Sequence, residues 1–269
     1  MKKLKIIAKL ANENKASIYL VGGAIRDYFL NLKINDYDFV LNKNTFKISR
    51  EFADKINGKH LIMDENNKIY RVIKEDLEFD FTLCRGKNIK EDLKQRDFTI
   101  NAMAIRDIYF KELNLNQKDN FNKAKIIDPF NGKLDLKNNV LRAVDKRIFD
   151  KDPLRILRAI RFKAKSSFEI ESKTEKLMIE NKEKIMSVAA ERVHDEIIKI
   201  FSYSNTAKIF KYMQNKINLL YHARKSIDSV DTHKILKLID SYAKRNELIF
   251  YIDEDKLPLF KIAVILLEL

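Results

Sequence analysis

The hydrophobic pattern of this chain changes once, near residue 150, and that change limits the class of fold that it can form. Between residues 17 and 110, short runs rich in β-branched and aromatic residues alternate with helical patterns near 23–31 and 44–57. The expected strands are SIYLV, DYDFV, KHLIM, KIYRVI and LEFDFTL. After residue 150, apolar residues recur every three or four positions between Lys, Glu and Arg, which is the period of surface helices. The pattern predicts an α+β fold, in which a mixed β-sheet flanked by helices is followed by an all-α part.

Turn signals support a boundary between the α+β part and the all-α part. DPFNG (128–132) is typical of a turn. Asp152-Pro153 predicts the start of a helix, with Asp as N-cap and Pro in the first helical position.

The sequence also predicts the character of the N-terminal segment, of residues 114–125 and of the C-terminal segment. The N-terminal MKKLKIIAKLANENK is interrupted by Lys9, which favours an amphipathic helix over a signal peptide. NLNQKDNFNKAK (114–125) is typical of an exposed hairpin tip or insertion. The C-terminal LPLFKIAVILLEL is too short and too charged to span a membrane. It ends within an apolar pattern, so we expect a truncated chain or an end buried against another element.

Composition indicates which class of partner the protein binds and which cellular compartment it occupies. A net charge of +14 predicts a polyanionic partner, with nucleic acid favoured over an anionic membrane surface. An AT-rich genome would also enrich Lys, Asn and Ile together, so charge alone does not decide. The basic residues are spread along the chain rather than gathered in one polybasic cluster, which argues against a membrane partner. The single cysteine, Cys84, excludes an internal disulfide and fits the cytoplasm.

Two of only five glycines, Gly22 and Gly23, stand between a predicted strand and a predicted helix. Glycine lets the backbone approach a phosphate closely at a helix N-terminus. Arg26 follows one turn into the helix and could reach the same phosphates. A Gly-Gly pair alone indicates only a turn, but here an Asp-x-Asp motif follows closely.

Asp36 and Asp38 are one residue apart in DYDFV, so their side chains are expected on the same face of a strand. Two adjacent carboxylates repel each other unless a cation lies between them, and oxygen ligands favour Mg²⁺. In LEFDFTL, Asp80 is a candidate third carboxylate that would allow a second metal. The alternative for Asp80 is an ordinary solvent-facing residue of an amphipathic strand.

Arg155, Arg158 and Arg161 follow one another at three-residue steps and sweep one side of a predicted helix. Such a stripe is usually a solvated basic face, but all three positions are Arg in a chain that otherwise uses Lys freely. Asp152 precedes Arg155 by one turn. A carboxylate accepts a hydrogen bond from the amino group of cytosine or adenine, and a guanidinium donates to the neighbouring ring atom. This pair would therefore accept C and A and reject U and G.

Five segments together resemble the class II tRNA nucleotidyltransferases and bacterial poly(A) polymerases of the DNA polymerase beta-like superfamily. The chain is identified as a member of that family on motifs between about residues 18 and 200, which occur in family order. The matching segments are LVGGAIRDYFLNLKINDYDFV, EDLKQRDFTINAMA, IIDPFNGKLDLKNNVLRAV, KDPLRILRAIRF and AERVHDEIIKI.

The resemblance implies a catalytic head at 1–140, a neck that recognises the base at 141–200 and a helical body at 201–269. In the head, Asp36 and Asp38 would hold catalytic Mg²⁺, and Asp80 would be the third carboxylate. The residues that would bind the nucleotide are Gly22, Gly23, Arg26, Arg96, Asp152, Arg155, Arg158 and Arg161. Arg192 and Glu196 of the fifth motif would brace the neck helices.

The implied reaction is template-independent addition of C or A, from CTP or ATP, to the 3′ acceptor end of tRNA. The RNA 3′-hydroxyl would attack the nucleotide α-phosphate in a two-metal site. Enzymes that add only CC or only A, and poly(A) polymerases, remain alternatives, as does an RNA-binding protein with an inactive site. The sequence does not indicate the oligomeric state.

Several positions depart from the family pattern. Lys151 stands where the family usually has Glu, and Asn31, Asn131 and Asp145 replace usual glycines. The segment between Asp80 and EDLKQRD is short. CCA-adding members have a longer flexible loop there that helps add the terminal A, so the short segment favours similarity to CC-adding enzymes.

Overall fold

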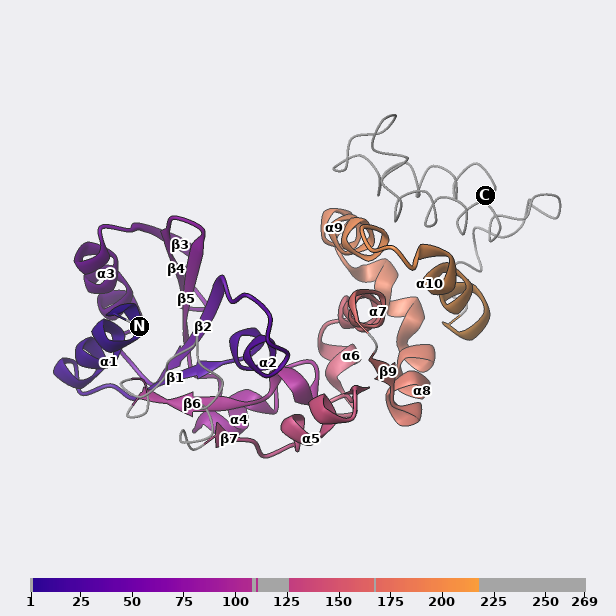
Figure 1. Cartoon of the computed structure of the whole chain (residues 1–269), viewed down its shortest axis with the longest axis horizontal. Coiled ribbons are helices and arrows are strands. Elements are labelled where there is room, and N and C mark those ends of the chain that lie inside the picture. Colours follow the sequence, from indigo (N-terminus) through magenta and orange to yellow (C-terminus); the bar gives the residue numbers. More distant parts are fainter. Residues whose placement is uncertain (1, 108–109, 111–125, 167, 218–269) are drawn as a thin grey trace. The chain divides into compact units, whose positions relative to one another are not determined.

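The computed structural model describes residues 2–107, 110, 126–166 and 168–217. These residues belong to two compact units, shown in Figure 1. Of the described residues, the first unit contains those up to Asn138 together with Arg142–Asp145, and the second contains Asn139–Leu141 and those from Lys146 to Ile217. The expected insertion at 114–125 and the apolar C-terminal segment lie outside the described residues.

The first unit is built on a seven-stranded mixed sheet with the strand order β3-β4-β5-β2-β1-β6-β7. Strands β2 and β5 are parallel, whereas the other neighbouring pairs are antiparallel. The strands are β1 (Ile18–Val21), β2 (Asp36–Leu41), β3 (Lys59–Asp64), β4 (Ile69–Lys74), β5 (Leu77–Leu83), β6 (Ala104–Arg106) and β7 (Ile126–Ile127). The mixed sheet and all five expected strands are confirmed. The short strands β6 and β7 were not predicted.

Helices surround this sheet. The helices of the first unit are α1 (Lys2–Glu13), α2 (Gly23–Phe29), α3 (Thr45–Ile56), α4 (Ile89–Leu93) and α5 (Gly132–Lys137), with a 3₁₀ turn η1 (Thr99–Asn101). Helices α2 and α3 confirm the helices expected near 23–31 and 44–57. Helix α3 packs on β3, β4 and β5 and is itself contacted by α1, which lies beside it in Figure 1. Helix α2 packs against β1 and β2. The N-terminal amphipathic helix is also confirmed, because Leu4, Ile7 and Leu10 are buried.

The two faces of the central strands have different neighbours, because side chains alternate along a strand. On one face, the buried Phe39 and Phe81 rings stack at 5.3 Å, and Phe52 of α3 meets the Phe79 ring edge-on at 5.1 Å. The opposite face of β2 carries Asp36, Asp38 and Val40.

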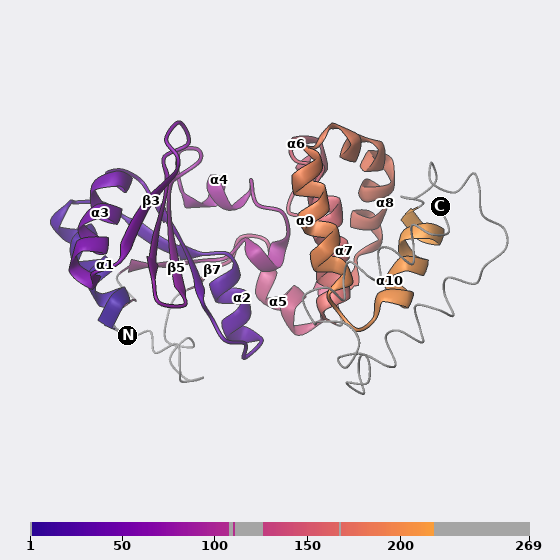
Figure 2. The same cartoon turned by 90° about the horizontal axis from the view of Figure 1, so that it is seen from above.

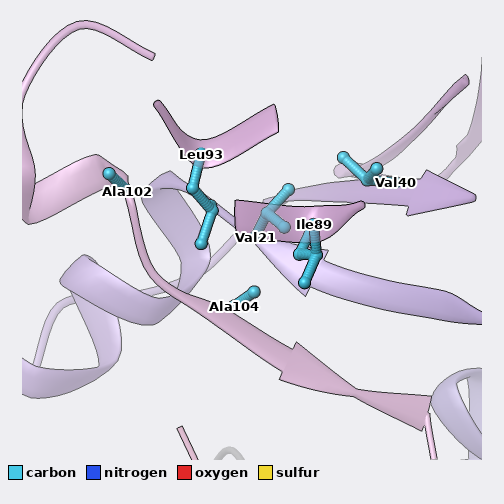
Figure 3. Packing of buried hydrophobic residues seen from close by; sticks show 6 residues of the cluster. All are labelled: Val21, Val40, Ile89, Leu93, Ala102 and Ala104. Carbon is cyan, nitrogen blue, oxygen red and sulfur yellow. The ribbon is translucent and has the colours of Figure 1, made fainter. Parts of the chain in front are cut away.

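Helix α4 covers only one end of this second face. Its residues Ile89 and Leu93 form a buried cluster with Val21, Val40, Ala102 and Ala104 (Figure 3). Asp36, at the other end of β2, is exposed, and Asp38 is partly buried. The sheet therefore has an apolar core beneath α4 and an acidic, more accessible end.

The second unit is mainly helical. It contains β8 (Val140–Leu141), α6 (Ile148–Lys151), α7 (Arg155–Lys165), β9 (Glu169–Ile170), α8 (Ser172–Asn181), η3 (Lys182–Ser187), α9 (Ala190–Phe201), α10 (Thr206–Tyr212) and η4 (Met213–Ile217). Helices α7 and α9 pack together, as Figures 1 and 2 show. The expectation that this part is purely helical is wrong in one respect, because β8 and β9 form a short parallel pair.

The predicted start of the arginine helix is also wrong. Asp152 is the C-cap of α6 rather than an N-cap, and α7 begins at Arg155. The backbone N–H groups of Arg155 and Ile156 donate to the carbonyls of Asp152 and Pro153, three residues back. The chain therefore passes from α6 to α7 through a tight turn, and this turn leaves the Asp152 carboxylate available to other partners.

Two of the departures from the family's glycines have a simple backbone explanation. Asn31 and Asn131 have φ angles of 56° and 60°, in the left-handed region. Asparagine is the residue that, after glycine, adopts this conformation most readily. Both substitutions thus preserve the turns that glycine would make. Among the described residues, no helix is long and apolar enough to cross a membrane.

Candidate active site

Strand pairing brings the predicted carboxylates of the first unit together. In the parallel pair of β2 and β5, Asp38 is the partner of Asp80, and Asp36 is the partner of Glu78. Partners in neighbouring strands point to the same face of a sheet. Four carboxylates from two strands therefore share the acidic end described above.

Asp38 lies at the centre of this group. Burial raises the pKa of its carboxyl, and the charges of Asp80 and Asp36 raise it further, while Arg96 and Arg26 oppose the shift. A partly buried carboxylate that faces two other carboxylates is stabilised by a cation. Within the described part of the chain, no three His, Cys, Asp or Glu side chains form a ready-made metal cage. Asp36 and Asp38 nevertheless fit Mg²⁺, which proteins commonly bind through one or two carboxylates together with substrate phosphates.

Gly22 is the point of closest packing beside Asp38. Its φ angle is +71°, and a Cβ atom there would lie 2.8 Å from Arg96 Nη1 and 3.0 Å from Asp38 Oδ2. Gly23, the first residue of α2, is less crowded, because a Cβ there would be 3.4 Å from Arg26 Nη2. The first glycine is therefore required by both conformation and space, and it lets the strand-to-helix turn pass directly beside the acidic group.

Arg26 is held in place from two sides. Its Nε and Nη2 atoms donate to the carboxylate of Asp27 at 2.8 and 2.9 Å, and its Nη1 donates to Asn101 Oδ1 at 2.8 Å. Asn101 is buried and donates in turn to Asp97 at 2.9 Å. The roles of Asn101 and Asp97 were missed in the sequence, although their four-residue spacing in QRDFTINA was a visible signal.

Arg96 is placed by the segment that follows β5. Its Nε lies 3.5 Å from Oδ2 of the buried Asp92, whose other oxygen accepts from the Arg85 backbone N–H at 3.0 Å. The short segment before α4 is closed by further bonds. Glu91 accepts from the Lys87 N–H at 2.8 Å, and the Asn88 side chain caps α4. This segment is thus a compact, capped turn.

Arg71 of β4 is a component of the site that the sequence reading missed. Its Nε and Nη2 donate to the two oxygens of Asp80 at 2.7 and 2.8 Å, and Nη1 pairs closely with Glu78. Arg71 is the partner of Asp80 in the antiparallel pair of β4 and β5. Finding it from sequence would have required the pairing register, which the alternation of polar and apolar residues does not reveal.

The second unit gathers its predicted residues around α7. Arg155 Nε is 4.0 Å from Asp152 Oδ2, and Arg192 of α9 donates from Nη2 to both Asp152 oxygens at 3.4 Å. Arg158 is partly buried on the same helix. On the opposite side of α7, Ile156, Leu157 and Ile160 are buried, as expected.

Arg161 joins α7 to α9. Its Nε lies 3.1 Å from Oε2 of Glu196, a glutamate that is only 5% exposed. The side chains of Arg155 and Arg161 are 13% and 22% exposed, which does not fit a fully solvated basic face. Glu196 therefore links α9 to α7, whereas Arg192 lies beside Asp152, the carboxylate predicted to contact the base.

Two family models match this chain. One is described as the poly A polymerase head domain and matches residues 18–142, and the other is described as a probable RNA and SrmB-binding site of polymerase A and matches residues 167–222. A CC-adding tRNA nucleotidyltransferase from Geobacter sulfurreducens is 34% identical over 197 residues, covering 72% of this chain and 43% of the relative. A CCA-adding enzyme from Lactobacillus johnsonii is 33% identical over 218 residues, covering 76% and 51% respectively. The chain thus spans about half the length of these curated relatives.

Solved structures of tRNA nucleotidyltransferases are also similar to this chain. The Thermotoga maritima CCA-adding enzyme complexed with tRNA matches with a TM-score of 0.79 and 30% identity, covering 97% of this chain and 61% of that one. A tRNA nucleotidyltransferase complexed with a primer tRNA and an incoming ATP analog matches with a TM-score of 0.78 and 27% identity, covering 95% and 74%.

Proposed function

Since this chain belongs to the family of class II tRNA nucleotidyltransferases and bacterial poly(A) polymerases, we propose that it is a template-independent RNA nucleotidyltransferase. It adds C, A or both to the 3′ end of tRNA and takes CTP and ATP as substrates. Similar solved structures are described as CCA-adding enzymes with ATP and with CTP. Its proposed partners are the tRNA acceptor end and nucleoside triphosphates, and its proposed compartment is the cytoplasm.

One observation supports this proposal above the others: the pairing of Asp36 and Asp38 with a second acidic strand beside Gly22. This arrangement combines two carboxylates that suit a cation, a glycine turn whose backbone passes close beside Asp38, and two arginines, Arg26 and Arg96, whose charges act on Asp38. These are the groups that binding a metal-bound triphosphate requires.

In the proposed reaction, Asp36 and Asp38 would hold Mg²⁺, and the RNA 3′-hydroxyl attacks the α-phosphate, whose bond to the leaving pyrophosphate breaks. When bound, Mg²⁺ lowers the pKa of the attacking hydroxyl and neutralises charge on the triphosphate. Arg26 and Arg96 orient the phosphates by charge-assisted hydrogen bonds. The Arg26 guanidinium is held by Asp27 and Asn101, so little side-chain freedom is lost on binding.

We assign choice of the base to Asp152 and Arg155, supported by Arg158 and Arg161. Asp152 accepts from the amino group of cytosine or adenine, and Arg155 donates to the neighbouring ring atom. Arg155 Nε lies 4.0 Å from Asp152 Oδ2, and both Asp152 oxygens accept from Arg192 Nη2 at 3.4 Å, so a carboxylate and a guanidinium stand side by side, as a base edge with one donor and one acceptor requires. Uracil or guanine would leave these polar groups unpaired, and this costs binding energy.

A second candidate, an enzyme that adds only CC, is favoured by three observations. The segment before α4 is a short capped turn, and Lys151 stands where the family usually has Glu. A CC-adding enzyme is also among the similar relatives. Enzymes that add only A and poly(A) polymerases are further alternatives, and an RNA-binding protein with an inactive site is the remote one.

The test uses tRNA transcripts that end at the discriminator base, at C and at CC, each with Mg²⁺ and one labelled nucleoside triphosphate. Addition of C to the first two and of A to the third identifies CCA addition, whereas addition that halts at CC identifies the second candidate. Addition of A to the CC end alone identifies an enzyme that adds only A, and long A tails on arbitrary RNA identify a poly(A) polymerase. No transfer to any primer, with tRNA still bound, contradicts the enzymatic proposal.

A further inference from the structure

We infer that the second unit contains a binding site for a terminal phosphate group, that is, for a phosphate monoester or pyrophosphate. The site is a hollow where the end of α7, the residue before β9 and the start of α10 meet. This inference goes beyond the proposed function, because no step of nucleotide transfer described above uses the residues of this hollow. Only the tRNA measurement in its test depends on that function.

The hollow has the size of a small-ligand site and is anchored in the core of the second unit. Its volume is about 340 Å³, which lies in the range of small-molecule sites. Three of the residues that line it are buried: Ala164 of α7, Phe168 before β9 and Ile209 of α10. Helices α7 and α10 also pack against each other. The shape of the hollow is therefore fixed by core packing.

Positive charge converges on this hollow from two helices. Lys163 and Lys165 lie in the last turn of α7, and Lys208 lies in α10. Among the described residues that line the hollow, Glu169 is the one carboxylate, so the lining carries two net positive charges. The C-terminus of a helix favours cations, which accounts for Lys163 and Lys165. It does not account for Lys208, which comes from a different helix and points to an anionic ligand.

The three lysines differ in what they contact. Lys163 is fixed, because its Nζ donates to Glu169 and lies 5.2 Å from the centre of the Tyr212 ring. Lys165 and Lys208 are exposed, and neither has a carboxylate at ion-pair distance within the part of the chain that the structure describes. Two ammonium groups are thus available to a ligand in the hollow, and an anion between like charges stabilises both.

Hydroxyl groups complete a lining that suits phosphate. Tyr203 and Ser204 lie in the turn between α9 and α10 and line the hollow together with the lysines. Hydroxyls donate hydrogen bonds to phosphate oxygens, and lysine binds phosphate as a point charge. The lining therefore combines the two kinds of donor that a phosphate group accepts from.

The charge of the hollow favours a terminal phosphate over one within an RNA backbone. A backbone phosphate carries one negative charge, whereas a phosphate monoester carries about 1.5 to 2 at neutral pH. Two available ammonium groups match the monoester, or pyrophosphate, more closely. Such a group occurs at the 5′ end of an RNA and at the end of a free nucleotide, and the test separates these two sources.

The first experiment titrates pyrophosphate into the whole chain by isothermal titration calorimetry. EDTA is present, so that no divalent metal supports binding at the acidic site of the first unit. The test variant combines Lys165→Met with Lys208→Met, two exposed positions at which a substitution leaves the core intact. Its affinity for pyrophosphate should fall at least about tenfold, because two charge-assisted hydrogen bonds are lost. Unchanged affinity, or no binding by the wild type, would overturn the inference.

Two further variants control for overall charge and for the proposed active site. Lys173→Met combined with Lys176→Met removes two exposed lysines of α8 that do not line the hollow. It should change the affinity by less than about twofold, since salt screens distant charges. Arg26→Met alters the proposed triphosphate site and should leave binding in the hollow in place. A tenfold loss in the α8 variant, or loss of all binding in Arg26→Met, would contradict the inference.

A filter-binding measurement identifies the source of the phosphate. The wild type and the Lys165→Met/Lys208→Met variant are each tested with tRNA that carries a 5′-phosphate and with tRNA from which it has been removed. If its removal weakens binding to the wild type alone, the site takes the 5′ end of RNA. If its removal weakens neither, while pyrophosphate binds in the hollow, the site takes a free phosphate ligand.

One result of the same measurement would refute the inference. If the variant bound both forms of tRNA more weakly and the wild type bound no pyrophosphate, the lysines would contact backbone phosphates instead. Because both experiments measure binding without turnover, a chain that transfers no nucleotide would refute the proposed function and leave this inference standing.

Discussion

Asp38 and Asp152, the central carboxylates of the two units, occupy opposite kinds of surroundings. Asp38 lies in a strand beside Gly22, where an added methyl group would meet Arg96 and Asp38 at 2.8 and 3.0 Å, and Arg71 donates to both oxygens of the adjacent Asp80 at 2.7 and 2.8 Å. Asp152 follows a short helix, and its contacts with Arg192 and Arg155 are 3.4 and 4.0 Å long. We therefore propose that the first site is rigid, as phosphoryl transfer requires, and that the second adjusts its contacts to two different bases.

The largest expected effect comes from Asp38→Asn. We expect transfer to fall by at least about a thousandfold, because a neutral amide is a poor metal ligand and the metal contributes several kcal/mol to the barrier reduction. Single-turnover transfer of labelled C to a tRNA lacking CCA measures this effect. A loss below tenfold would contradict the rigid metal site, and retained tRNA binding is the control for folding.

The same substitution should raise stability when divalent metal is absent. Burial and two neighbouring carboxylates raise the pKa of Asp38 above its ordinary value, so at neutral pH its ionised form destabilises the fold. The folded state binds the proton more tightly than the unfolded state, so metal-free stability should rise as pH falls from neutrality through the raised pKa. Thermal unfolding in EDTA should show a higher melting temperature for Asp38→Asn and a weaker pH dependence. A lower melting temperature for Asp38→Asn than for the wild type at neutral pH would show that the ionised Asp38 carboxylate does not destabilise the fold.

Gly22→Ala compared with Gly23→Ala measures how closely the first site is packed. At Gly22, a methyl group would lie 2.8 Å from Arg96 at a φ of +71°, so we expect about a hundredfold loss in kcat and a stability cost of about 1–3 kcal/mol. At Gly23 the nearest contact, Arg26 Nη2, is 3.4 Å away and the φ angle lies outside the left-handed region, so the loss should be below tenfold. Equal effects at the two positions would refute the special role of Gly22.

Arg161→Met tests the helix brace that supports the second site. Among the described residues, it leaves Glu196, which is 5% exposed, with the more distant Lys199 at 3.7 Å as its one remaining ion-pair partner. The variant should cost about 2–3 kcal/mol of unfolding free energy. Arg161→Met combined with Glu196→Gln should recover most of this loss, because the buried charge is then also removed. Urea denaturation measures both variants, and additive losses would contradict the pairing.

The smallest expected effect is that of Lys94→Met. Lys94 is 58% exposed and lies 3.9 Å from Asp145, and exposed ion pairs of this kind contribute under about 1 kcal/mol. Transfer rate and urea midpoint should both remain close to the wild type. A large loss of activity would place an essential residue outside both the acidic site of the first unit and the Asp152 site of the second.

The sequence revealed the parts of this molecule that depend on local periodicity. Alternation in DYDFV and LEFDFTL predicted which residues share a strand face, and the structure brings Asp36, Asp38 and Asp80 onto one face. The contact of Arg71 with Asp80 was not predictable, because it depends on the pairing of β4 with β5, and strand register is set by tertiary packing. The turn at Asp152-Pro153 was misread because a proline that starts a helix and one that joins two helices have the same local sequence signal.

The most direct test of the division between the two sites is one incorporation assay with all four nucleoside triphosphates, using wild type, Asp36→Ala and Asp152→Asn. We expect Asp36→Ala to lose transfer of every nucleotide. Asp152→Asn should retain transfer but lose about tenfold or more of its preference for C and A over U and G, since an amide can both donate and accept. If Asp152→Asn kept the wild-type preference, or lost all transfer as Asp36→Ala does, chemistry and base choice would not reside in separate parts of the chain.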